Sequence, residues 1–327
     1  MTAVLSLNYL DSRPLFVLFS ALNRNGYDLE GNPEMHPIRL WLREQVAALP
    51  ADPYFARALP GWPRAGWLGC ALFCLDDRYD WRVDPEPLWD EIAWESPEPI
   101  DADARAWLRE LPARLRWWET QLATLASGSQ PGLWEQYQAL IRQREPAGIR
   151  DAIAAGVRER LSGSPFSVSR EPVIVPNYLQ SDWSTDPVHI GERVYIITGP
   201  LSLRTVGGIV HEALHETFGP LLRPIREQLG EYVAAFSDDR ALLTRWGYWN
   251  ADPAKTVFKV FEECCVRAAG QWLQGAGPDD GWDRYGLGLA RAVLAHFEQH
   301  GLFRDSEAVK AFLAARAAAP EPPASSL

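Results

Sequence analysis

Cysteine is scarce in this chain, and its spacing excludes a disulfide framework. The 327 residues include four cysteines. Cys264 and Cys265 are adjacent, and Cys70 and Cys74 lie one helical turn apart, so a disulfide within either pair would constrain little of the fold. Cysteine otherwise packs as a small hydrophobic residue. We therefore expect reduced, buried thiols, as is usual in a reducing compartment.

Long apolar runs are also missing. A membrane-spanning helix needs roughly 18 or more consecutive apolar residues, and no segment of the sequence approaches that length. Near the N-terminus, Asn8, Asp11, Arg13 and Pro14 interrupt the apolar run, and no basic residue precedes it, unlike a secretory signal. The sequence therefore predicts a cytoplasmic protein with no signal peptide and no transmembrane segment.

Positive charge is in deficit. Lys and Arg number 32 against 43 Asp and Glu, which gives a formal net charge of -11. Nucleic acids and anionic membrane surfaces are bound through basic patches. The charge balance therefore argues against both as the main partner. Tryptophan, by contrast, is abundant, with 15 residues that supply bulk for a core or for apolar clefts.

Helical periodicity dominates the first half of the chain. Apolar residues recur there at intervals of three and four, the pattern of an amphipathic helix. The helical segments expected from this pattern are residues 14–25, 37–49, 107–125, 133–144 and 149–161. The same periodicity returns after the middle of the chain and continues to about residue 319.

A short β-rich stretch separates the two helical regions. Residues 166–178 and 188–198 are rich in β-branched side chains and are expected to be strands, with the polar stretch 180–187 as a loop between them. We expect them to form a small antiparallel sheet. The tail from residue 319 is rich in Pro and Ser, a composition typical of disorder.

These patterns predict an α+β protein that is mainly α. The expected organisation is a helical N-terminal region over residues 1–163, a second region over residues 164–318, and a disordered tail over residues 319–327. The second region contains the sheet and the candidate catalytic motif described next.

The clearest chemical signal is the segment IVHEALHETF at residues 209–218. His211 and His215 are four positions apart, which on a helix is about 40° of rotation and roughly 6 Å of rise. Both imidazoles therefore project from one face and can reach a single zinc ion. Glu212 lies beside this pair, placed to take a proton from a water that the ion activates. The spacing predicts a zinc site with Glu212 as general base.

The helix expected to carry this motif spans residues 205–218. Gly207 and Gly208 lower its intrinsic stability, so packing must hold it, and they permit close approach of the preceding strand. Gly219 and Pro220 follow as a helix stop.

A catalytic zinc ion usually has three protein ligands. The continuation after His215 excludes the third histidine of an HExxHxxGxxH pattern, so the third ligand is expected to be a carboxylate on a later helix. Residues 257–273 contain the adjacent acids Glu262 and Glu263 within an otherwise apolar helix. Periodicity slightly favours Glu262 as the buried acid. In the alternative, both are surface acids and Glu263 pairs with Arg267 at i,i+4.

With these two motifs, the chain resembles the gluzincins, the thermolysin-like zinc metallopeptidases. More closely, HEALHETFGP and EECCVRA resemble an uncharacterised bacterial family of HExxH proteins, a domain of unknown function whose second motif reads like NExxVRA. The resemblance implies a zincin-like fold with small sheet and motif helix, and it implies Glu263 as the third zinc ligand. The matching motifs cover a small part of the chain.

Two departures from the thermolysin-like pattern stand out. Arg267 occupies the region where those enzymes have an aspartate that orients a ligand histidine, so that role is vacant or filled differently, and Arg267 is a candidate partner of Glu263. The gap between His215 and Glu263 is also longer, so residues 220–250 are expected to contain an inserted helix.

A peptidase also needs a donor for the oxyanion of the tetrahedral intermediate. The candidates are Tyr178, Tyr195, Tyr248, Tyr285, His296 and Arg267, and spacing singles out none of them. The strand around Val194–Ile197 is a candidate edge for binding an extended peptide. Glu216 is expected to face solvent, with a substrate or ligand-supporting contact as the alternative.

The sequence thus predicts a zinc-dependent hydrolase that cleaves peptide bonds in a peptide or protein substrate. Two alternatives stay open. The chain is either a zincin-fold protein that binds a partner without cleaving it, or a zinc hydrolase that acts on a non-peptide amide.

Overall fold

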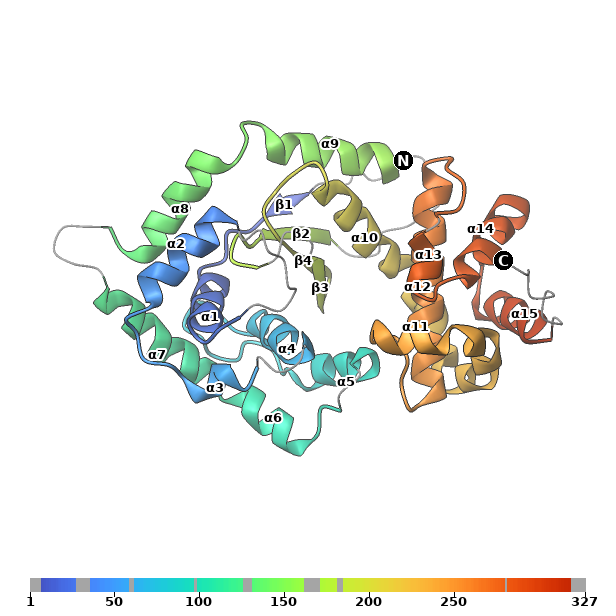
Figure 1. Ribbon diagram of the computed structural model, residues 1–327, viewed down its shortest axis with the longest axis horizontal. Helices are drawn as coiled ribbons and strands as arrows, with labels where there is room; N and C mark the ends of the chain where they lie inside the picture. Colours follow the sequence, from blue (N-terminus) through green and yellow to red (C-terminus); the bar gives the residue numbers. More distant parts are fainter. Residues whose placement is uncertain are drawn as a thin grey trace. The chain divides into compact units, whose positions relative to one another are not determined.

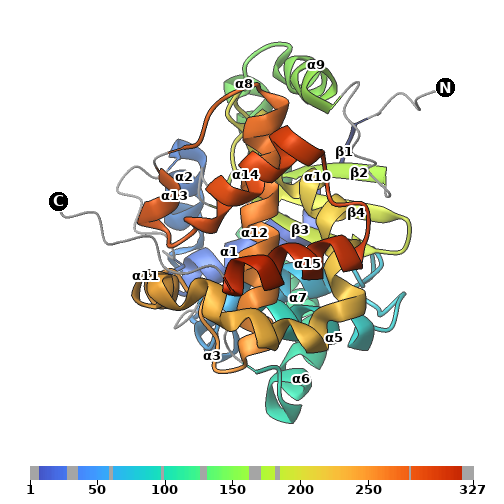
Figure 2. The same ribbon diagram turned by 90° about the vertical axis from the view of Figure 1, so that its right-hand side faces the viewer.

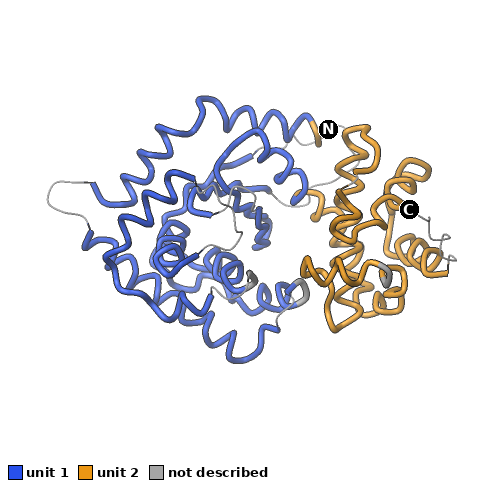
Figure 3. The backbone as a smooth tube through the Cα atoms, viewed as in Figure 1, with its two compact units in different colours: residues 1–159, 170–212 blue, residues 160–169, 213–327 orange. Residues whose placement is uncertain are grey.

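The computed structural model describes residues 7–27, 36–58, 62–96, 99–125, 131–161, 171–180, 185–279 and 281–318. The predicted region boundary at residue 163 and the predicted tail 319–327 lie outside these residues. The chain divides into two compact units, residues 1–159 with 170–212, and residues 160–169 with 213–327 (Figure 3). The division falls inside one continuous helix, α10 (Thr205–Leu222). The fold is mainly helical with one small sheet, so the predicted α+β class is confirmed (Figure 1).

Among the described residues, nine helices precede the main strands of the sheet. They are α1 (Arg13–Arg24), α2 (Pro37–Val46), α3 (Pro53–Ala56), α4 (Trp62–Leu72), α5 (Glu86–Glu95), α6 (Ala102–Arg109), α7 (Leu111–Thr124), α8 (Leu133–Arg144) and α9 (Ile149–Leu161). The prediction of a single helix over residues 107–125 is wrong, because two helices, α6 and α7, are separated at Glu110. Pro112 is the second residue of α7 and, lacking an N–H, would be costly in the interior of one continuous helix.

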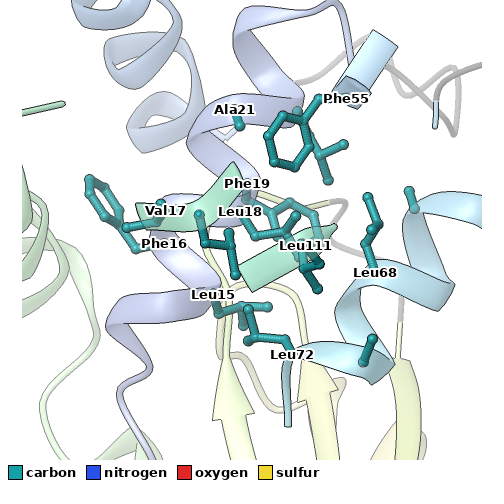
Figure 4. Packing of buried hydrophobic residues seen from close by; sticks show 14 of the residues in the cluster. Leu15, Phe16, Val17, Leu18, Phe19, Ala21, Phe55, Leu68, Leu72 and Leu111 are labelled. Atoms are coloured by element: carbon teal, nitrogen blue, oxygen red, sulfur yellow. The ribbon is translucent and has the colours of Figure 1, made fainter. Parts of the chain in front are cut away.

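Helix α1 forms the centre of the first unit. All residues from Leu15 to Asn23 are buried, and a helix buried on every side belongs in a core. Figure 4 shows its side chains packed with Phe55, Leu68 and Leu111 from three other helices. Each fully buried Leu or Phe contributes about 1.5–3 kcal/mol relative to exposure. The same apolar core includes residues of the later strands, Val173, Val188 and Ile197 among them, and therefore supports the sheet.

The sheet has the strand order β1-β2-β4-β3, with β1 (Asn8–Tyr9), β2 (Glu171–Pro176), β3 (Thr185–Ile190) and β4 (Arg193–Thr198). Strands β1 and β2, and β2 and β4, are parallel, whereas β3 and β4 are antiparallel. The predicted antiparallel sheet is therefore wrong for two of its three pairings. The prediction omitted β1, which comes from the far N-terminal part of the chain.

Residues 188–198 form a hairpin and not the single predicted strand. Gly191 adopts a φ of 59° between β3 and β4, a conformation that glycine accepts without strain. Strand β3 also includes Thr185–Pro187, which were predicted as loop. Pro187 is tolerated because β3 pairs on one side only. Val194–Ile197 lies in β4, between β2 and β3, so the prediction that it is a sheet edge is wrong.

The second unit contains the rest of α10, a 3₁₀ helix η1 (Arg223–Asp239), and helices α11 (Arg240–Arg245), α12 (Pro253–Leu273), α13 (Gly281–Arg284), α14 (Leu289–His300) and α15 (Ser306–Ala317). Helix α12 is its centre and packs against η1 and α14 (Figure 2). Asp252 caps α12 by accepting from the amide of Ala254. The helix predicted within residues 220–250 is present as η1 and the short α11.

Helix α10 extends past its predicted stop. It includes Pro220 and ends at Leu222, so the expectation that Gly219 and Pro220 end it is wrong by several residues. Among the described helices, none combines the length and the apolar character needed to cross a membrane. Cys74, Cys264 and Cys265 are buried and Cys70 is half-buried, and all four thiols are free. Burial raises the pKa of the Cys74 thiol to about 11.

Close packing of α10 on the sheet depends on Gly208. A Cβ at this position would lie 2.7 Å from Oγ1 of Thr185 on β3, whereas a Cβ at Gly207 would meet no described atom within 4 Å. The predicted close approach of a strand is thus confirmed for Gly208.

We expect Gly208→Ala to lower the free energy of unfolding by about 1–3 kcal/mol through overpacking. Urea unfolding of Gly207→Ala is the matched control, and it is expected to be unchanged or stabilised by up to about 1 kcal/mol. Equal stability of the two variants would contradict the close approach.

Candidate metal centre

The structure brings three of the predicted site residues together. One ligand atom each from His211, His215 and Glu263 lie within 4.8 Å of one another. His211 and His215 occupy successive turns of α10, and Glu263 comes from the middle of α12. Of the two acids that the sequence left open, Glu263 is the one in this group.

Histidine 215 lies between the two adjacent acids of α12. Its Nδ1 is 3.4 Å from Oε2 of Glu262, and its Nε2 is 3.7 Å from Oε2 of Glu263. Consecutive residues of a helix point about 100° apart. The side chains of Glu262 and Glu263 therefore reach opposite nitrogens of one imidazole ring. Periodicity slightly favoured Glu262 as the buried acid, whereas the structure buries both Glu262 and Glu263.

Arg267 holds the far side of the Glu263 carboxylate. Its Nε donates a hydrogen bond of 2.6 Å to Oε1 of Glu263, one helical turn away on α12, while Oε2 faces His215. Burial alone would lower the pKa of Arg267, but the charge of Glu263 and the contact with Tyr248 outweigh it and raise the pKa. The predicted i,i+4 pair is thus present, but Glu263 in it is buried and not a surface acid.

Buried negative charge is concentrated at this place. Among the described residues, five acids are buried: Asp52, Glu212, Glu216, Glu262 and Glu263. Four of the five lie on α10 and α12, each between 5% and 9% exposed. Buried charges are costly unless they are paired or bind a metal. The prediction that Glu216 faces solvent is wrong, because its side chain belongs to this buried group.

The donor set fits a zinc ion. Two imidazole nitrogens and one carboxylate oxygen are the ligands of a common type of catalytic zinc site. Ligand atoms about 2.0–2.2 Å from a tetrahedral ion lie roughly 3.4 Å from one another. The separation of 3.7 Å between His215 and Glu263 is close to this value, and all three atoms lie within 4.8 Å. Modest side-chain movement therefore completes a three-ligand site.

The predicted oxyanion donors divide into two groups. Three have partners of their own: Tyr178 donates to Glu145 at 3.0 Å, and Tyr195 and His296 stack on Phe73 and Phe303, each with ring centroids 4.6 Å apart. The remaining three are Arg267 itself and two tyrosines that contact it.

Tyr248 and Tyr285 both contact the guanidinium that holds Glu263. Arg267 hydrogen-bonds the side chain of Tyr248, and its Cζ lies 5.3 Å from the centroid of the Tyr285 ring. Burial and then the charge of Glu263 raise the pKa of the Tyr248 hydroxyl, which keeps it protonated. No spacing in the sequence links either tyrosine to the motif, because the connection is made by tertiary packing.

The contact of Glu262 with His215 was missed by sequence reasoning, which treated Glu262 only as a rival ligand. The available signal was the presence of two consecutive acids in an apolar helix, since two buried carboxylates need two partners.

Comparison of the chain with family profiles, curated proteins and solved structures finds no match. The resemblance to gluzincins and to the bacterial HExxH family therefore stays a prediction that rests on two short motifs.

Proposed function

We propose that this chain is a zinc-dependent hydrolase that cleaves peptide bonds. The observation that carries the proposal is the convergence of His211, His215 and Glu263 within 4.8 Å, in a part of the fold where buried carboxylates are concentrated. The adjacent Glu212 is itself buried, as expected for a base that works in a site sheltered from solvent.

In this proposal His211, His215 and Glu263 hold the ion. A zinc ion held there would act as a Lewis acid, which would polarise the scissile carbonyl and make the attacking water more acidic. Glu212 accepts a proton from the attacking water and returns it to the leaving amine nitrogen. Arg267 fixes one oxygen of Glu263, and the protonated hydroxyl of Tyr248 is the candidate donor to the developing oxyanion.

The proposed substrates are peptides or proteins, and the predicted compartment is the cytoplasm. The gluzincin resemblance supports peptides over other amides. The two alternatives, a non-cleaving binding protein and a hydrolase of a non-peptide amide, are separate outcomes of the same experiment.

Removal of metal is expected to abolish hydrolysis of a mixed fluorogenic peptide library, and one equivalent of zinc is expected to restore it. Zinc at about 100 times its Kd should also stabilise the fold by about 2.7 kcal/mol, which a thermal unfolding scan measures. Zinc binding without cleavage of peptides or simple amides would favour the binding protein, and cleavage of amides alone would favour the second alternative. A chain that takes up no zinc would overturn the proposal.

A further inference from the structure

The adjacent acids Glu262 and Glu263 meet different nitrogens of His215, and this difference separates their roles. Glu263 faces Nε2 at 3.7 Å and belongs to the group of three ligand atoms. Glu262 faces Nδ1 at 3.4 Å and is not in that group. An imidazole binds a metal through one nitrogen, and the partner of the other nitrogen sets its tautomer and ring orientation.

We propose that Glu262 is a positioning residue, which accepts the Nδ1 proton of His215 and presents Nε2 to the metal. This inference deepens the proposed function, because it takes His215 as a ligand. It assigns the orienting role to the immediate sequence neighbour of the third ligand.

The surroundings of Glu262 support a fixed carboxylate. The residue is only 9% exposed, on the helix that forms the centre of the second unit. A Cβ placed on Gly219 of α10 would lie 3.0 Å from Oε1 of Glu262 and 3.7 Å from a terminal nitrogen of Arg223. Gly219 therefore leaves the room that Oε1 needs, while Oε2 faces His215.

The shorter of the two ring contacts, between Nδ1 and Glu262, favours one position for the imidazole proton. If Nδ1 carries the proton and donates to Glu262, Nε2 is left with a lone pair, which is the form that binds zinc. A carboxylate on the second ring nitrogen also fixes the orientation of the imidazole toward a metal. Loss of such an outer contact typically costs 10- to 100-fold in metal affinity.

The deciding measurement is the tautomer of His215 in the metal-free protein. Long-range ¹H–¹⁵N spectra of full-length protein with ¹⁵N-labelled histidine, recorded at a pH where the imidazole is neutral, show which nitrogen carries the proton. His215→Asn assigns the signal. We expect the Nδ1–H form in the wild type and its loss in Glu262→Leu. An Nε2–H form in the wild type, or an Nδ1–H form that persists in Glu262→Leu, would overturn the proposal.

Zinc affinity gives a second measurement. By competition with a chromophoric chelator, Glu262→Leu and Glu262→Gln are expected to bind one zinc per chain with a Kd raised about 10- to 100-fold. Gly219→Ala, which removes no charge but crowds Oε1, is expected to shift the Kd in the same direction, with Gly207→Ala as the unchanged control for an added methyl on the same helix. A Kd within threefold of wild type in all three variants would contradict the assignment.

The two measurements separate this inference from the proposed function. The tautomer is measured in the metal-free wild-type protein, and His215→Asn serves only to assign the signal, so the measurement remains decisive if Glu262→Leu does not fold. A wild-type protein with the Nδ1–H form that binds no zinc would remove the proposed function and leave Glu262 as the residue that orients His215.

Discussion

Replacing Glu212 with glutamine is expected to lower kcat for peptide hydrolysis by about 10²- to 10⁴-fold while zinc binding is retained. The amide keeps the size of the side chain but cannot accept a proton from the attacking water. His211 and His215 keep their positions on α10, because the substitution removes no ligand and no cap. Steady-state kinetics on zinc-loaded protein, with the zinc content measured on the same sample, tests this expectation.

Glu216→Gln is the matched control for this experiment. Glu216 is also a buried acid of α10, one helical turn after Glu212, so both variants remove one buried negative charge from the same helix. We expect less than a tenfold change in kcat for Glu216→Gln. Equal losses in the two variants would mean that buried charge and not proton transfer is responsible, and full activity in Glu212→Gln would require another base.

The second large effect concerns the ligands. His211→Ala and Glu263→Ala each leave two protein ligands, and we expect the zinc affinity to fall by more than about 100-fold, beyond the losses typical of outer contacts. Elemental analysis after dialysis against a weak chelator measures the stoichiometry. Wild-type protein is expected to keep one zinc per chain, and both variants are expected to lose it.

A further variant controls for the ion pair in this comparison. Glu263→Ala also leaves Arg267 without its carboxylate, and a half-buried cation that loses its partner destabilises the fold. Glu263→Gln keeps an oxygen that accepts from Arg267 but is a weak zinc ligand. Loss of zinc in both variants identifies the carboxylate as the ligand. Zinc retained in both would move the third ligand to another residue and contradict the arrangement described above.

The parts of the fold that follow from local periodicity were predictable from the sequence. Helices α8 and α9 have the predicted bounds, because each is a single amphipathic segment between turn residues. The positions of His211 and His215 on one helical face also followed directly, since residues four apart lie about one turn apart on the same side of a helix. Glu263 was predicted as the third ligand only from the resemblance of two short motifs to known families.

The parts that depend on distant segments were not predictable. The parallel pairing of β1 with β2 joins Asn8 to Val173, and no local pattern encodes such a contact. The hairpin between β3 and β4 was read as one strand because its turn interrupts the β-branched pattern for only two residues. Glu216 looked like a surface acid because periodicity describes one helix, whereas burial depends on what packs against it.

The donor set of two imidazoles and one carboxylate has a consequence for preparing the protein. Affinity of nitrogen and oxygen sites for divalent ions generally rises from Mn²⁺ through Co²⁺ and Ni²⁺ to Cu²⁺, with Zn²⁺ below Cu²⁺. His211, His215 and Glu263 offer nothing that rejects these competitors by chemistry alone. The ion found after expression will therefore report the metals supplied in the growth medium. Co²⁺ in particular should occupy the same three ligands and give a coloured protein in which ligand loss can be followed by eye.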